Sequence, residues 1–167
     1  MLQDNQKPKA IKEKLLSFLE NDNPFFYTKK LIDKQVDEIE FTKKYLIQNL
    51  KNHFSEEILS GLIIKGPGDV ALPRFEFLNS ISITDIVFIK NSQKIISIEV
   101  KIIDSVSNRN QNISTAIGQG IIQSLGKYKY SIVYILDLGM GDFDSDIRSL
   151  KEKLSNMDVS LIYKKDK

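Results

Sequence analysis

Two charged residues interrupt an apolar stretch in the middle of the chain, and an acid lies in the apolar stretch before it. Glu99 and Lys101 lie in "IISIEVKII" (95–103), and Asp85 lies in "SISITDIVFI" (80–89). Both stretches are rich in β-branched residues, which predicts strands. Residues two apart in a strand point to the same face, so Glu99 and Lys101 are expected side by side. Two carboxylates beside an amine have the groups needed to bind a divalent cation and to hold a phosphate.

The apolar surroundings make these acids unusual. Asp and Glu are seldom buried unless they are paired or bound to metal. Two close carboxylates repel each other, and a divalent cation removes that cost. The alternative is a surface ion pair, in which Asp85 and Glu99 lie at strand ends and Lys101 neutralises one of them. The Glu-x-Lys tripeptide alone does not decide, because about one is expected by chance in a chain of this composition.

The register of the hairpin decides whether the acids meet. With a two-residue loop at 92–93, Asp85 would face Val100, and the acids would lie on opposite faces of the sheet. A three-residue loop or one β-bulge would pair Asp85 with Glu99 or Lys101 and bring all three side chains to one face. We predict this second arrangement.

The elements that must hold these residues alternate between helices and strands. Hydrophobic periodicity predicts helices over about 9–20, 33–54, 114–128 and 144–156, with Ser114 as a possible N-cap. Strands are predicted within 56–66 and over 80–89, 95–103, 131–138 and 159–163, and 104–112 is a polar loop. The helix over 33–54 has an apolar stripe that consists of Val36, Ile39, Leu46, Leu50 and Phe54. The last two strands flank a helix and are expected to be parallel. This order predicts an α/β sandwich on a mixed sheet.

Composition narrows the class of protein. The chain has 167 residues, 41% hydrophobic and 28% charged, which predicts a single globular domain. Its net charge of +2 excludes a uniformly basic coat, so contacts with nucleic acid must come from a local patch. The absence of cysteine excludes disulfides, thiolate metal sites and a cysteine nucleophile. No apolar run approaches the length of a membrane span, and the first residues lack an apolar signal core, so we expect a cytoplasmic protein.

The pattern resembles the PD-(D/E)XK nucleases, the restriction-endonuclease-like superfamily. In that family an Asp on the second core strand and an acid-x-Lys on the third form the active centre, and Asp85 and residues 99–101 match them here. Thr84 stands where the family has proline. The family's order of helix, three strands, helix and strand matches about 34–137. The resemblance implies a three-layer α/β sandwich with a central mixed β-sheet flanked by helices, of core order αβββαβ plus a C-terminal αβ.

That resemblance divides the single domain, 1–167, into three parts. Residues 1–33 would be an N-terminal helical extension, 34–137 the catalytic core, and 138–167 a helix-strand addition. The family's activity implies a Mg²⁺-dependent endonuclease that hydrolyses phosphodiester bonds of DNA, with Mn²⁺ able to substitute. The alternative is a catalytically inactive relative that binds DNA or a protein. A homodimer or a subunit of a larger complex is compatible with either, and neither involves a membrane.

The resemblance also assigns roles to the three central residues. Asp85 and Glu99 would bind Mg²⁺, with the Val100 carbonyl as a further ligand, and the ion would activate a water. Lys101 would orient that water or stabilise the developing negative charge. An unperturbed lysine, with a pKa of about 10.4, is a poor base at neutral pH, which favours these positioning and electrostatic roles.

Further residues are candidates by their place in the family's pattern. Gln119 follows on the next helix and would orient the lysine or a water. Glu40 is our candidate for an acid from the first helix, and Glu38 is nearly as good. The candidates for DNA contact are Arg109, Arg74, Lys43 and Gln123. Each surface candidate has an ordinary alternative, which is a flexible loop, a plain connection or a solvated helix face.

Overall fold

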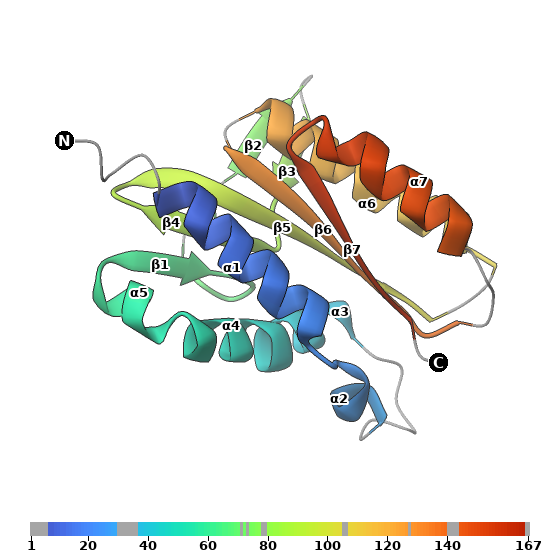
Figure 1. Ribbon diagram of the computed structural model, residues 1–167, viewed down its shortest axis with the longest axis horizontal. Coiled ribbons are helices and arrows are strands. Elements are labelled where there is room, and N and C mark those ends of the chain that lie inside the picture. Colours follow the sequence, from blue (N-terminus) through green and yellow to red (C-terminus); the bar gives the residue numbers. More distant parts are fainter. Residues whose placement is uncertain are drawn as a thin grey trace.

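Helices cover both faces of an open, five-stranded sheet in the computed structural model of the chain (Figure 1). The structure describes residues 7–29, 37–70, 72, 74–77, 80–104, 107–126, 128–139 and 144–165. The helices are α1 (Lys7–Asn21), α2 (Phe25–Lys29), α3 (Glu38–Phe41), the π-helical η1 (Thr42–Leu46), α4 (Ile47–His53), α5 (Ser55–Leu59), α6 (Arg109–Leu125) and α7 (Asp144–Ser155). The strands are β1 (Leu62–Lys65), β2 (Arg74–Phe77), β3 (Ser80–Ile83), β4 (Ile86–Lys90), β5 (Gln93–Ile103), β6 (Tyr130–Asp137) and β7 (Val159–Lys165).

The main sheet is mixed and has the strand order β1-β4-β5-β6-β7. β4 is antiparallel to both of its neighbours, whereas β5, β6 and β7 are parallel. The parallel pairs are joined through α6 and α7, as expected for βαβ units. β2 and β3 form a separate two-stranded sheet. The predictions of an α/β fold on a mixed sheet flanked by helices, and of parallel final strands, are confirmed.

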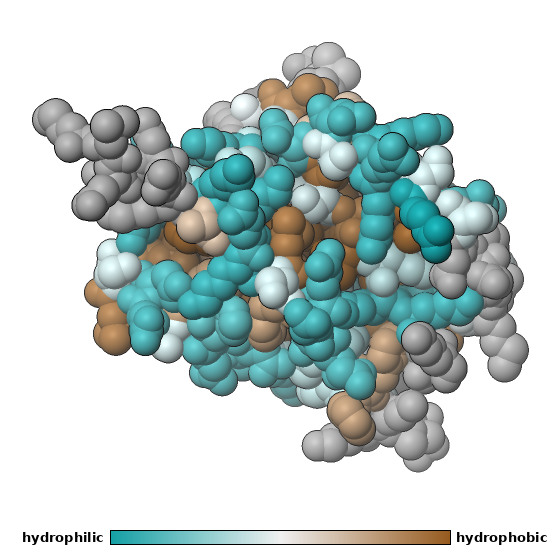
Figure 2. All heavy atoms as spheres, viewed as in Figure 1, coloured by the Kyte–Doolittle hydropathy of each residue, from teal (hydrophilic) through white to brown (hydrophobic). Residues whose placement is uncertain are grey.

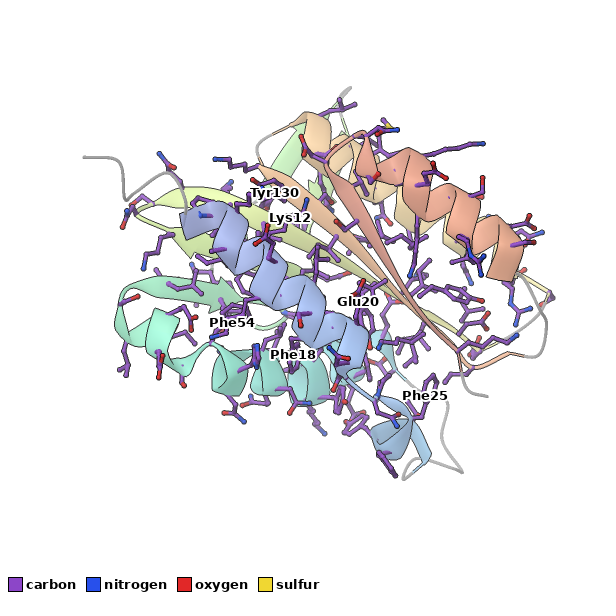
Figure 3. All side chains as sticks on the ribbon, in the orientation of Figure 1. Lys12, Phe18, Glu20, Phe25, Phe54 and Tyr130 are labelled. Atoms are coloured by element: carbon purple, nitrogen blue, oxygen red, sulfur yellow. The ribbon has the colours of Figure 1, made fainter. Side chains whose placement is uncertain are left out.

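The two faces of the sheet pack against different helices. Even-numbered β5 residues from Ile96 to Ile102 join an apolar cluster with α1 and α4. Ile103 belongs to a second cluster with residues of α6 and α7. α1 lies over the first face beside α4, where Phe18 and Phe54 are found, and Lys12 lies over the ring of Tyr130 (Figures 1 and 3). The outward surfaces of α1 and α4 are hydrophilic (Figure 2). Because strand side chains alternate, Glu99 and Lys101 lie on the α6 face.

The hairpin between β4 and β5 has a tight turn and a bulge. The turn residues 91–92 have positive φ angles of 51° and 61°, as in the two-residue turns that match strand twist. Ile89 pairs with Lys94, but Phe88 pairs with Ile96, so β5 has one residue more than β4 between these pairs. The extra residue is a β-bulge, which displaces the register of everything beyond it by one.

This bulge brings the two acids to one face. Beyond it Ile86 pairs with Ile98, so Asp85, the next residue outward, stands opposite Glu99. Without the bulge, the turn alone would place Asp85 opposite Ile98, and the acids would lie on opposite faces of the sheet. The prediction that the two acids share one face is therefore confirmed, and of a three-residue loop and a bulge the structure has the bulge.

Several predicted boundaries were wrong. The strand expected over 80–89 is broken at Thr84 and Asp85, and its first part pairs with β2, which was not predicted. α6 begins at Arg109 rather than at Ser114, within the expected polar loop. Polar residues at a helix start or a strand bend obscure the periodicity on which these predictions depended.

The predicted helix over 33–54 is present from residue 38 onward, and residues 33–36 lie outside the described part of the chain. Its π-helical stretch adds one residue to a turn. One residue corresponds to about 100° of rotation, so side chains before η1 are turned relative to those after it. Ile39, expected in the apolar stripe, is therefore 63% exposed.

Two glycines of α6 are expected to respond oppositely to alanine. A Cβ on Gly120 would lie 2.4 Å from Val133 Cγ2, whereas a Cβ on Gly118 would meet nothing within 4 Å. Gly118→Ala should stabilise the fold by about 0.5–1 kcal/mol through helix propensity, and Gly120→Ala should destabilise it by about 1–3 kcal/mol through overpacking. Urea unfolding of both variants measures the difference. Equal shifts of the same sign would contradict this packing of α6 on β6.

Within the described ranges, no helix has both the length and the apolarity needed to cross a membrane.

Candidate active site

β5 extends beyond the end of β4, and carboxylates occupy the edge that β4 leaves open. β4 begins at Ile86, whereas β5 continues to Ile103. On this edge the Val100 N–H donates to Asp85 Oδ2 at 2.8 Å, and the Ile102 N–H donates to Glu38 Oε2 at 3.1 Å. Two side chains thus take the place of strand partners, which fixes both carboxylates against the backbone of β5.

Glu99 is held from the opposite side, by α6. The residue is only 5% exposed, and Gln123 Nε2 donates to its Oε2 at 2.9 Å. Gln123 is itself fully buried. The close approach of α6 to β6 at Gly120 allows Gln123 to reach the sheet. The carboxylate of Glu99 is therefore oriented by a buried amide.

Lys101 pairs with Glu38, the first residue of α3. Its Nζ lies 3.2 Å from Glu38 Oε2, and both side chains are partly exposed. Since Glu38 also accepts the Ile102 N–H, it links the ammonium group to the open edge of β5. The site contains three carboxylates, those of Glu38, Asp85 and Glu99, and one ammonium group.

Burial, with a smaller contribution from the neighbouring carboxylates, raises the pKa values of Asp85 and Glu99. Burial, and then the charge of Asp85, raise the pKa of Glu99 to about 8 against the opposing hydrogen bond from Gln123. Burial raises the pKa of Asp85 to about 6, with the Val100 N–H opposing and the charge of Glu38 adding to the rise. Lys101 lowers both pKa values but does not offset burial. Positive charge near these carboxylates would favour their ionised forms.

Each buried acid uses one oxygen for a hydrogen bond, and its other oxygen has no partner among the described residues. Asp85 uses Oδ2 for the Val100 N–H, and Glu99 uses Oε2 for Gln123. Among the residues whose placement is described, none donates a hydrogen bond to Asp85 Oδ1 or Glu99 Oε1. The N–H and carbonyl of one strand residue point to the same side, so the Val100 carbonyl also faces this edge. Three oxygens, from two opposed residues and one backbone position, are available to a ligand.

This donor set fits Mg²⁺ better than a cation that needs a complete protein cage. In the described ranges, no three acid or histidine side chains form a ready metal-binding group. Mg²⁺ is commonly bound by one or two carboxylates and otherwise by water and substrate phosphate. Asp85 and Glu99 supply those two carboxylates, and the excess negative charge of the site favours a divalent cation.

The structure brings Glu38 of α3, and not the preferred candidate Glu40, to the open edge of β5. Glu40 is exposed and pairs with Lys44 along the helix. The extra residue of η1 rotates α3 so that Glu38 faces β5 and Glu40 faces outward. Of the two candidate acids, only Glu38 therefore contacts β5 and Lys101.

Of the two candidate glutamines, Gln123 and not Gln119 contacts a residue of the site. Gln123, expected to contact DNA, is fully buried against Glu99, so the predicted DNA contact is wrong. Gln119, expected to orient the lysine or a water, is half-buried, and no hydrogen bond joins it to another described residue. It lies one turn from Gln123 on α6.

Arg109 was expected to bind DNA but lies in the interior. It is 2% exposed, and its Nη2 donates to Asp137 Oδ1 at 2.9 Å. Asp137 also accepts hydrogen bonds from the Gly139 N–H and the Tyr163 hydroxyl. A guanidinium buried in this way cannot reach a phosphate. Arg109 instead fixes the first turn of α6 to the end of β6, and the prediction was wrong.

Lys43 lies beside the turn that borders Asp85. It is exposed, and its Nζ is 3.1 Å from the place that a Cβ of Gly68 would take. The same turn approaches the site, because a Cβ on Gly66 would lie 3.4 Å from the Asp85 carbonyl oxygen. DNA contact by Lys43 stays a prediction. Arg74 lies in β2, and its side chain is outside the described part of the structure.

One polar contact near the site was not predicted. The Thr84 hydroxyl donates to the Tyr128 hydroxyl at 3.2 Å, and both side chains are buried. Thr84 precedes Asp85, and Tyr128 follows α6. The only signal in the sequence was the threonine at the family's proline position, which gave no indication of its partner.

Comparison of the chain with family models, curated proteins and solved structures finds no match.

Proposed function

We propose that this protein is a metal-dependent endonuclease that hydrolyses phosphodiester bonds of DNA. The observation that carries the proposal is the pair of carboxylate oxygens, Asp85 Oδ1 and Glu99 Oε1, to which no described residue donates a hydrogen bond. Asp85 and Glu99 stand opposite each other beside Lys101. A purely structural ion-pair cluster would need no excess of negative charge, whereas three carboxylates here surround one ammonium group and a divalent cation would balance them.

Each residue of the site has a role in this proposal. Mg²⁺, when bound, would supply an activated water and stabilise charge on the phosphate. Asp85 and Glu99 hold the ion, while the Val100 N–H and Gln123 fix their orientation. Lys101, held by Glu38, donates to a phosphate oxygen as negative charge develops.

The element order supports assignment to the restriction-endonuclease-like fold. A helix precedes β1, β4 and β5, and α6 and β6 follow in the expected order. The acid-x-Lys segment lies on the third of these main-sheet strands, and Asp85 lies immediately before the second. The β2–β3 hairpin is then an insertion between the first two core strands.

The experiment is a cleavage assay on linear, branched and single-stranded DNA, and on RNA, with Mg²⁺, Mn²⁺ or EDTA. We expect cleavage of DNA with Mg²⁺ or Mn²⁺ only, and none by Asp85→Asn, which should still fold. Salt-sensitive DNA binding without cleavage under any of these conditions would favour the inactive, DNA-binding alternative. Absence of both DNA binding and cleavage would reject the proposal.

A further inference from the structure

A buried hydrogen bond joins the two segments that support the metal-binding acids. The Thr84 hydroxyl donates to the Tyr128 hydroxyl at 3.2 Å, and these residues are 1% and 4% exposed. Thr84 directly precedes Asp85, whereas Tyr128 lies five residues after Gln123, the partner of Glu99. The bond therefore connects the support of one acid to the support of the other, over 44 residues of sequence.

The chain at Thr84 needs such a connection. Thr84 and Asp85 form the corner between β3 and β4, which belong to different sheets. Neither residue lies within a strand ladder, so sheet hydrogen bonds do not fix the corner. What orients it on one side is the bond from the Val100 N–H to Asp85, and on the other the bond from Thr84 to Tyr128. Without the bond from Thr84 to Tyr128, the bond from the Val100 N–H to Asp85 would have to hold the corner by itself.

Packing by itself does not account for two hydroxyl groups here. Valine and phenylalanine have nearly the shapes of threonine and tyrosine, and neither brings a polar group that must be satisfied when buried. Burial of Tyr128 is extensive enough to raise the pKa of its hydroxyl, with the bond to Thr84 opposing the rise. The polar pair thus provides a directional link where an apolar pair would provide only contact.

We propose that Tyr128 is a positioning residue, which acts through Thr84 to hold Asp85 opposite Glu99. Its effect on catalysis rests on the proposed nuclease function. Its effect on the position of Asp85 does not, because that position can be measured without metal or substrate.

The test uses hydrogen exchange of two backbone amides on the same edge of β5. The Val100 N–H donates to Asp85, and the Ile102 N–H donates to Glu38, which Tyr128 does not support. In metal-free protein, Tyr128→Phe and Thr84→Val should each speed exchange of Val100 by about five- to tenfold, the effect expected of one lost hydrogen bond. Ile102 should exchange at the wild-type rate. Thr84→Ser keeps the hydroxyl, so Val100 should stay as protected in it as in the wild type.

A second measurement connects position to catalysis. For cleavage, the same variants should lower kcat by about tenfold and leave KM unchanged, because the reacting groups move and the bound substrate does not. The double variant should be no slower than either single variant, since both remove one bond.

Faster exchange of both amides together would indicate general loosening and would overturn the proposal, as would unchanged exchange at Val100. If Val100 alone responds but the wild-type protein cleaves nothing, the positioning role stands and the nuclease function fails. If Tyr128→Phe does not fold, Thr84→Val gives the same reading.

Discussion

Replacement of Lys101 by methionine is expected to lower the rate of DNA cleavage by about 10²–10³-fold, the usual effect of removing one donor from a developing negative charge. Methionine keeps much of the length and apolar stem of lysine but has no ammonium group. The side chain of Lys101 is partly exposed, so the fold should be unaffected. Single-turnover rates at saturating Mg²⁺, with thermal unfolding as the check on folding, measure the effect.

Matched variants separate this effect from a general loss of charge. Lys9 is also paired with a glutamate, Glu13, but on α1 at the other face of the sheet, so Lys9→Met should cleave at the wild-type rate. Glu38→Gln should slow cleavage, because Glu38 holds Lys101, while Glu40→Gln should not. Wild-type activity in Lys101→Met would remove the ammonium group from the mechanism.

The sequence was sufficient to locate the central residues because short-range rules govern them. Alternation along β5 placed Glu99 and Lys101 on one face. The requirement that Asp85 join them predicted an irregular register, and the structure supplies it as a bulge in the β4–β5 hairpin. The position of a bulge depends on packing across the whole sheet, so its existence could be predicted but its place could not.

The choice between Glu38 and Glu40 lay beyond helical periodicity. An ordinary helix would have put Ile39 in the apolar stripe with Leu46. The π-helical stretch rotates the preceding turn by about 100°, so Glu38 faces β5 and Ile39 faces solvent. Nothing in the residue types of η1 announces this extra residue. It is consistent with the tendency of such bulges to occur near functional sites.

The errors at α6 have a different cause, which is tertiary contact at long range. Arg109 was read as a surface residue because it lies in a polar segment, yet Asp137 binds it in the interior. That partner extends α6 to an earlier start than Ser114 would have given. Gln123, rather than Gln119, binds Glu99 because the packing of α6 on β6 determines which face of α6 points toward the sheet. One sequence gives no information on a partner so distant in the chain.

In metal-free protein at pH 9, Glu99→Gln is expected to be more stable than the wild type by roughly 2–4 kcal/mol, a conservative reading of the rise in pKa. The pKa of Glu99 is raised from an ordinary value of 4.5 to about 8. A raised carboxyl pKa means that the folded state keeps its proton while the unfolded state loses it. The contribution is present in full below pH 4.5 and is lost as the pH rises through about 8.

The neutral amide of glutamine removes this dependence without emptying the site. A glutamine at position 99 can still accept the hydrogen bond from Gln123 through its carbonyl oxygen. The difference between variant and wild type should therefore be small at pH 4.5 and should grow toward pH 9. Guanidinium unfolding in EDTA at a series of pH values measures it. Glu13→Gln, which neutralises an exposed acid, is the control and should show no such trend.

Addition of Mn²⁺ or Mg²⁺ should narrow the difference in stability between Glu99→Gln and the wild type at pH 9. A cation that binds only the folded state stabilises it by an amount set by its concentration relative to Kd, about 2.7 kcal/mol at one hundred times Kd. The wild type offers an ionised Glu99 to the cation, whereas Glu99→Gln offers a neutral amide, so the wild type should gain more stability. If the pH trend is seen but neither cation stabilises the wild type, the raised pKa of Glu99 is confirmed and the proposed metal binding is rejected. If the pH trend itself is absent, Glu99 is ionised over the whole pH range. The burial that raises its pKa would then be wrong.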